Sequence, residues 1–153
     1  MLLKGSCHCG AVKFQHQSKT PQPYMHCHCS ICRKTAGGGG YAINLGGDAT
    51  THKVDGADNV TIYVAVEGGS ERHFCKKCGS ALWAWDARWP DLIHAFASAI
   101  DTPLPKPPEV AHIMLGSAAS WVEAPKGPND KHFDEYPDAS IDDWHAARGL
   151  TAD

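Results

Sequence analysis

The chain has 153 residues, 42% of them hydrophobic and 20% charged, with a formal net charge of −3 and a pI of about 6.3. This composition excludes an intrinsically disordered chain, and no apolar run approaches the roughly 18 residues of a membrane-spanning helix. Without a basic surplus, neither nucleic acid nor a membrane surface is an expected partner. The length predicts one domain over residues 1–153. The first seven residues contain no apolar stretch typical of a secretion signal, so we expect a cytoplasmic protein.

The expected elements are mostly short strands. Apolar and polar residues alternate over residues 11–15, as in a half-buried strand, and the β-branched segment 60–66 predicts a well-buried strand. Further strands are expected at residues 41–45, 81–85, 93–97 and 112–115. Strands of this length, separated by turns, indicate a mainly β fold, either a sandwich or a small folded sheet.

Helices and long loops are few. Two short helices are expected, over residues 31–34 with Ser30 as N-cap and over residues 141–148 with Ser140 as N-cap. The four glycines from Gly37 to Gly40 predict a flexible turn, or alternatively a mobile flap beside the nearby cysteines. Residues 102–108 contain four prolines and predict an extended connection between strands.

Seven cysteines are the most informative residues in the chain. Their number is odd, so they cannot all pair within the chain, and in a reducing compartment clustered cysteines bind metal or perform chemistry. They fall into three clusters: Cys7 with Cys9, Cys27 with Cys29 and Cys32, and Cys75 with Cys78.

A glycine directly follows the first and the third cluster. Gly10 and Gly79 permit the positive φ that a tight metal-binding turn needs, whereas the second cluster ends in Cys32-Arg33. Paired, the first and third clusters supply four thiolates, the number that a closed structural zinc site uses. Iron is an alternative for four thiolates.

The second cluster allows three interpretations. Three thiolates would leave a fourth zinc position open for water or substrate, as in catalytic sites. The site could instead be closed by a histidine, with His26, His28 and His73 as candidates, or the thiols could cycle through a disulfide.

The three clusters and their surroundings resemble the glutathione-dependent formaldehyde-activating enzyme family, which includes centromere-protein-V-type proteins. The similar segments span residues 5–14, 27–34, 74–80 and 112–121, so the resemblance covers roughly residues 3–125 and excludes the tail from about residue 126. It implies a β-tent fold of folded sheets. It implies a structural zinc on Cys7, Cys9, Cys75 and Cys78, and a catalytic zinc on Cys27, Cys29 and Cys32. The family activity is the addition of glutathione to formaldehyde, a carbon–sulfur lyase reaction when written in reverse.

A zinc ion held by three thiolates carries a net charge of about −1, and its main use is to hold a further thiol deprotonated as the nucleophile. A nearby cation should stabilise the negative charge of this site. Arg33 and Lys34 are the local candidates for that role and for binding the carboxylates of glutathione. His26, His28 and His73 are candidates for the general acid. A non-catalytic zinc-binding interaction module and a redox sensor remain the alternatives to the enzyme.

The tryptophans offer a second set of expectations. Trp83 and Trp85 should share one face of a strand and pack in the core. Trp89, Trp121 and Trp144 could line a pocket, and nothing in the sequence chooses among them.

Overall fold

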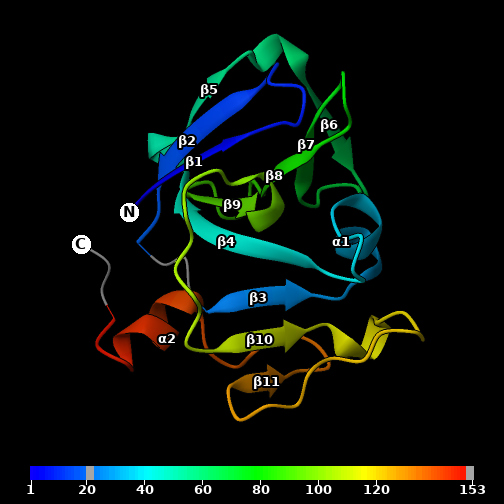
Figure 1. Cartoon of the computed structure of the whole chain (residues 1–153), viewed down its shortest axis with the longest axis vertical. Coiled ribbons are helices and arrows are strands. Elements are labelled where there is room, and N and C mark those ends of the chain that lie inside the picture. The colour runs from blue at the N-terminus through cyan, green and yellow to red at the C-terminus, as the bar shows by residue number, and fades with distance from the viewer. Residues whose placement is uncertain (20–22, 151–153) are drawn as a thin grey trace.

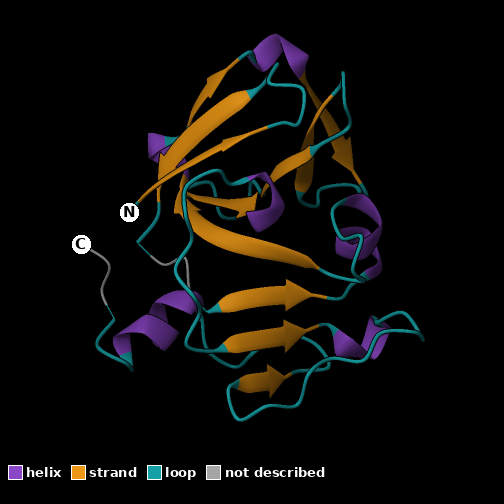
Figure 2. Ribbon diagram, viewed as in Figure 1, coloured by secondary structure: helices purple, strands orange, loops and turns teal. Residues whose placement is uncertain are grey.

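The computed structural model describes residues 1–19 and 23–150. The described residues form a mainly β structure in which every strand belongs to one of two sheets and the helices are short (Figures 1 and 2). In chain order the elements are β1 (Leu2–Ser6), β2 (Lys13–Gln17), β3 (Tyr24–Cys27), α1 (Ser30–Thr35), β4 (Ala42–Asp48), β5 (Lys53–Asp55), β6 (Val60–Val64), β7 (Glu71–Cys75), β8 (Ala81–Trp85), β9 (Leu92–Phe96), β10 (Val110–Ile113), β11 (Asp130–His132) and α2 (Ile141–Ala146).

The smaller sheet has the antiparallel strand order β1-β2-β5. It closely approaches the segment that follows β9 at Gly5, which forms a single β-bridge with Ile100. A Cβ atom at Gly5 would overlap the carbonyl oxygen of Ala99 and the ring of Phe14, so only glycine allows this approach.

The larger sheet has the strand order β11-β10-β3-β4-β9-β8-β7-β6. Strand β10 runs parallel to both β3 and β11, and the remaining neighbours are antiparallel. Figure 1 shows β3, β10 and β11 at one end of the molecule and the smaller sheet at the other. Each sheet has two free edges, so neither closes into a barrel.

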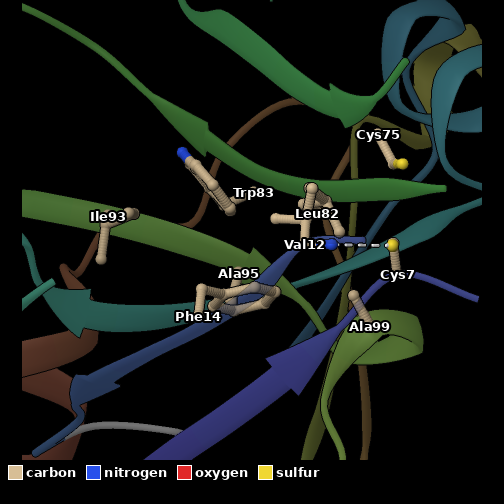
Figure 3. Packing of buried hydrophobic residues seen from close by; sticks show 9 residues of the cluster. All are labelled: Cys7, Val12, Phe14, Cys75, Leu82, Trp83, Ile93, Ala95 and Ala99. Carbon is tan, nitrogen blue, oxygen red and sulfur yellow. Dashed lines mark hydrogen bonds between the residues drawn. The ribbon is translucent and has the colours of Figure 1, made fainter. Parts of the chain in front are cut away.

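The main core lies between the two sheets. Val12 and Phe14 come from the first hairpin, and they pack against Leu82, Trp83 and other side chains of β8 and β9. Trp83 meets the ring of Phe14 edge to face, with 5.1 Å between ring centroids. Figure 3 shows Cys7 and Cys75 at one side of this cluster, so the core ends where two of the cysteine clusters begin.

The expected strands are confirmed as elements, with shifted ends. Strand β8 has the predicted bounds, whereas β2, β4, β9 and β10 begin or end a few residues away from the expected ranges. The sequence did not predict β1, β3, β5, β7 or β11.

The expectation that residues 60–66 form a well-buried strand is wrong about burial. The strand exists as β6, but Ile62 is 53% exposed and Tyr63, on the opposite face, is 48% exposed. The reason is its position, because β6 is the last strand of the larger sheet and pairs only with β7.

Both expected helices are present. Helix α2 follows Ser140, which forms a reciprocal capping box with Asp143, and it ends two residues before the predicted end. Helix α1 begins one residue earlier than predicted, because the sulfur of Cys29, and not the hydroxyl of Ser30, accepts the hydrogen bond that caps it. No helix in the part of the chain that the structure describes is long and apolar enough to span a membrane.

Candidate metal centres

The first and third cysteine clusters meet at the junction of the two sheets. Cys7 and Cys9 lie in the turn between β1 and β2, Cys75 is the last residue of β7, and Cys78 lies in the turn from β7 to β8. The four sulfur atoms all lie within 4.8 Å of one another. We call this group the four-cysteine cluster.

The sulfur spacing in the four-cysteine cluster suits a tetrahedral metal ion. The Sγ atoms of Cys7 and Cys9 are 3.6 Å apart, and those of Cys9 and Cys75 are 3.8 Å apart. Zinc–sulfur bonds near 2.3 Å in a tetrahedron place the sulfurs about 3.8 Å from one another. The donor set therefore fits a closed zinc site.

The backbone of both turns supports the cluster. Gly10 and Gly79 have φ values of 74° and 75°, which confirms the positive φ expected from the sequence. The backbone N–H of Val12 donates a hydrogen bond to the Cys7 sulfur at 3.2 Å, drawn as a dashed line in Figure 3. Such donors stabilise a thiolate, because they favour the charged form of the sulfur.

Ser80 joins the two turns. Its hydroxyl oxygen accepts a hydrogen bond from the backbone N–H of His8 at 3.0 Å and lies 3.2 Å from the Cys78 sulfur. Hydrogen bonds from the hydroxyl and the backbone N–H of Ser80 lower the pKa of the Cys78 thiol to about 5. Cys78 is thus disposed to be a thiolate at neutral pH, as a metal ligand must be.

The second cluster lies where strand β3 leads into helix α1. Cys27 is the last residue of β3, Cys29 caps α1, and Cys32 lies within α1. Their sulfurs also lie within 4.8 Å of one another. The thiols of Cys27 and Cys32, together with the backbone N–H of Cys32, donate to the Cys29 sulfur and lower its pKa. We call this group the three-cysteine cluster.

The three-cysteine cluster opens onto a cavity of about 400 Å³. Its walls come from β3, β7, β8, β9, β10 and the segment after β11, and we call it the cysteine cavity. The four-cysteine cluster does not line it. The cavity volume falls in the range of small-molecule sites.

Four ionisable side chains share the cysteine cavity with the cysteines: Arg72, Asp86, His94 and the phenol of Tyr136. Asp86 is already paired, since Arg88 contacts it at 2.6 Å and the Ser70 hydroxyl donates to it at 2.7 Å. The Nε atom of Arg72 is buried and has no hydrogen-bond partner among the described residues. Arg72 is therefore the cation available to a ligand or to the thiolates.

Arg72 on β7 and His94 on β9 both pair with Ala84 of β8, which lies between them in the sheet. Burial, together with the positive charge of Arg72, lowers the pKa of His94 below its ordinary value. The imidazole is consequently neutral at pH 7 and able to accept a proton.

The three histidines expected near the site do not line the cysteine cavity. His26 stacks on Tyr41 with 4.2 Å between ring centroids, and His28 lies 3.4 Å from a nitrogen of His112. His73 interacts with Glu71 at 3.0 Å. On a strand the side chains alternate between faces, so His26 points away from the face that carries Cys27, and His73 points away from the face that carries Arg72.

The expected cations are also elsewhere. Arg33 and Lys34 follow Cys32 on α1, but neither lines the cysteine cavity. The sequence missed Arg72, His94 and Tyr136, which do line it. An available signal for His94 was its place as a polar residue within an expected apolar strand, and for Arg72 its place just before Cys75.

The tryptophans divide as follows. Trp83 is buried in the core, as expected, while Trp85 is half-buried and lines the cysteine cavity. Of the three candidates for a pocket, Trp89 lines the cysteine cavity, and Trp121 and Trp144 do not. The glycines from Gly37 to Gly40 form a loop that also lies outside it.

Comparison with known proteins agrees with these features. The family described as glutathione-dependent formaldehyde-activating enzyme matches residues 2–117. A protein of Halomonas elongata that bears the provisional name glutathione-dependent formaldehyde-activating enzyme is 58% identical, over 98% of each chain. A crystal structure of a Rhodobacter sphaeroides protein is 27% identical with a TM-score of 0.57, covering 67% of this chain and 91% of that one. The match over most of the chain and the extent of the identity show that the chain belongs to the glutathione-dependent formaldehyde-activating enzyme family.

Proposed function

We propose that the protein is a zinc-dependent carbon–sulfur lyase acting on thiol adducts of small aldehydes. Its family and the name of its Halomonas relative make S-hydroxymethylglutathione, formed from glutathione and formaldehyde, the first substrate to test. The observation that carries the proposal is the three-cysteine cluster, which opens onto a cavity large enough for a small molecule.

We assign different roles to the two cysteine clusters. Cys7, Cys9, Cys75 and Cys78 would hold a structural zinc with all four positions filled by protein, consistent with their sulfur spacing. Cys27, Cys29 and Cys32 would hold a second zinc with one position facing the cavity. When bound there, zinc supplies the means to keep the substrate thiol deprotonated at neutral pH.

In the cleavage direction, the hydroxyl of the adduct loses its proton, the carbon–oxygen double bond forms, and the carbon–sulfur bond breaks with its electron pair on sulfur. His94, neutral because of its lowered pKa, is placed to accept the hydroxyl proton. Arg72 balances the negative charge that remains on sulfur, since its buried Nε has no hydrogen-bond partner among the described residues. After the hydrogen bond from Cys27, its charge is a further effect that lowers the pKa of Cys32 against those that raise it. In the reverse direction the same proton returns to the oxygen.

The decisive experiment measures exchange between free formaldehyde and S-hydroxymethylglutathione at equilibrium by NMR, with zinc-loaded protein. We expect exchange faster than in the uncatalysed mixture. No acceleration, in a sample shown by metal analysis to hold two zinc ions per chain, would remove this substrate pair. A sample that accepts only one zinc ion would support the non-catalytic module instead.

A further inference from the structure

The cysteine cavity has a wall that lies outside the family region. The family matches residues 2–117, whereas Tyr136 and Ile141 come from the C-terminal segment, residues 118–150. Trp85 and Trp89, from the family region, also line the cavity. The cavity is thus enclosed between the family core and a segment that the family description does not include.

The C-terminal segment is fixed in place by its backbone. Strand β11 pairs in parallel with β10, and the backbone N–H groups of Met114 and Leu115 donate to the carbonyl oxygens of Glu135 and Phe133 at 2.9 and 3.1 Å. The Phe133 ring packs against the hydrophobic cluster that contains Cys27 and Cys32. The position of Tyr136, three residues later, is therefore tied to the three-cysteine cluster.

Glu109, the residue before β10, links the sheet to helix α2 and the residues after it. Glu109 accepts a hydrogen bond from the indole N–H of Trp144 at 2.8 Å and another from Arg148 at 3.1 Å. Ile141, at the start of α2, is held against the cavity by this attachment.

Two aromatic side chains stand at the cavity with much of their surface uncovered. Trp89 is 55% exposed and Tyr136 is 71% exposed, although both line the cavity. The guanidinium of Arg88 lies 4.8 Å from the centre of the Trp89 ring. We call Trp89 and Tyr136 the aromatic rim. Exposed apolar surface beside a cavity is typical of a binding site for an apolar group.

We propose that the aromatic rim selects thiol adducts whose aldehyde-derived part is apolar and larger than a hydroxymethyl group. This inference rests on the proposed reaction for its substrate class. An adduct has two parts, the thiol on one side of the new carbon–sulfur bond and the aldehyde-derived group on the other. Glutathione, the thiol of the family, is polar and carries two carboxylates, which suit cationic partners and not an aromatic surface. The apolar walls are then left for the aldehyde side, and formaldehyde offers no group to fill them.

Inert thioethers test this preference apart from catalysis. We would measure the affinities of S-benzylglutathione and S-methylglutathione for the full-length protein by calorimetry. We expect the benzyl compound to bind at least about tenfold more tightly, because even small apolar additions in a matched pocket change affinity by that factor. Trp89→Ala and Tyr136→Ala should each reduce this ratio toward one.

Two variants serve as controls. Trp121 is 66% exposed and Tyr63 is 48% exposed, and neither lines the cavity. Trp121→Ala and Tyr63→Ala should therefore retain the full ratio of benzyl to methyl affinity. Equal affinities for the two thioethers, no binding of either, or an unchanged ratio in both rim variants would overturn the inference. A retained benzyl preference without acceleration of any aldehyde exchange would instead refute the proposed reaction and leave the binding preference standing.

Discussion

The sulfur of Cys9 lies 3.8 Å from the sulfur of Cys75, although 66 positions separate the two residues in the chain. The contact joins the β1–β2 hairpin of the smaller sheet to the β7–β8 hairpin of the larger one. Closing so long a loop removes much of the conformational freedom of the unfolded chain. The four-cysteine cluster should accordingly matter most for stability.

Cys75→Ser should lower the free energy of unfolding by more than about 3 kcal/mol, because it removes a buried ligand of the proposed structural zinc. Cys29→Ser should cost less than about 1.5 kcal/mol, since a serine hydroxyl can still cap α1 in place of the sulfur. Chemical unfolding of both variants measures the difference. Equal losses would indicate that both clusters are structural and would argue against an open site.

Mild chelation should separate the two metal ions. A zinc ion facing the cavity is accessible to a chelator, whereas the ion of the four-cysteine cluster would have no free position. We expect one ion and the catalytic activity to be lost first, with far-UV circular dichroism unchanged, and unfolding only at higher chelator concentration. Loss of both ions in a single step together with the fold would contradict the assignment.

Arg72→Gln should reduce kcat/KM by roughly 10- to 100-fold, the range for losing a hydrogen bond to a charged group. Arg72→Lys should recover part of the rate, because the charge is retained. Steady-state kinetics of Lys34→Gln and Arg33→Gln provide the comparison. If either of those variants lost more activity than Arg72→Gln, the cation predicted from the sequence would be the correct one.

His94→Gln tests the proton acceptor. Because the pKa of His94 is lowered, the wild-type rate of adduct cleavage should be constant above pH 6.5 and should fall at lower pH as the imidazole becomes protonated. The variant should be slower by roughly 100-fold at neutral pH and should lose this dependence on pH. An identical pH profile in the variant, measured with zinc content checked at each pH, would assign the proton to another group.

Buried histidines should make the fold sensitive to acid. His16 is fully buried, and burial lowers its pKa to about 4. Between pH 6.5 and about 4 the unfolded chain binds the proton that the folded chain does not, so stability is present above pH 6.5 and falls as the pH decreases. The slope for one histidine is at most about 1.4 kcal/mol per pH unit. Urea unfolding at several pH values should show a shallower slope for His16→Phe than for the wild type, and equal slopes would refute this origin.

The sequence was most informative where local chemistry dictates geometry. Gly10 and Gly79 adopt the positive φ that their place after a cysteine predicted, and Ser140 caps α2 as expected. These features depend only on neighbours in the chain. The grouping of cysteines 7, 9, 75 and 78 was predictable for the same reason, because a glycine follows the last cysteine of both clusters.

Features that depend on sheet order were not predictable. The β-branched composition of β6 suggested burial, but its place at the sheet edge leaves Ile62 and Tyr63 about half exposed. Arg33 is next to Cys32 in sequence, yet Arg72, forty positions away, lines the cavity, because β7 and α1 meet only in the folded chain. No sequence neighbour of Tyr136 indicates that it lines the cavity, because its position depends on the path of the chain after β11.

The arrangement of the four-cysteine cluster has a consequence for the newly made chain. Cys7 and Cys9 are synthesised long before Cys75 and Cys78. The first pair therefore remains as free thiols while the intervening strands are made. During that interval these sulfurs are open to oxidation and to binding by other metals. Successful maturation therefore depends on a reducing environment and on the supply of zinc at the time of translation, and shortage of either should reduce the yield of folded protein before it affects any molecule already assembled.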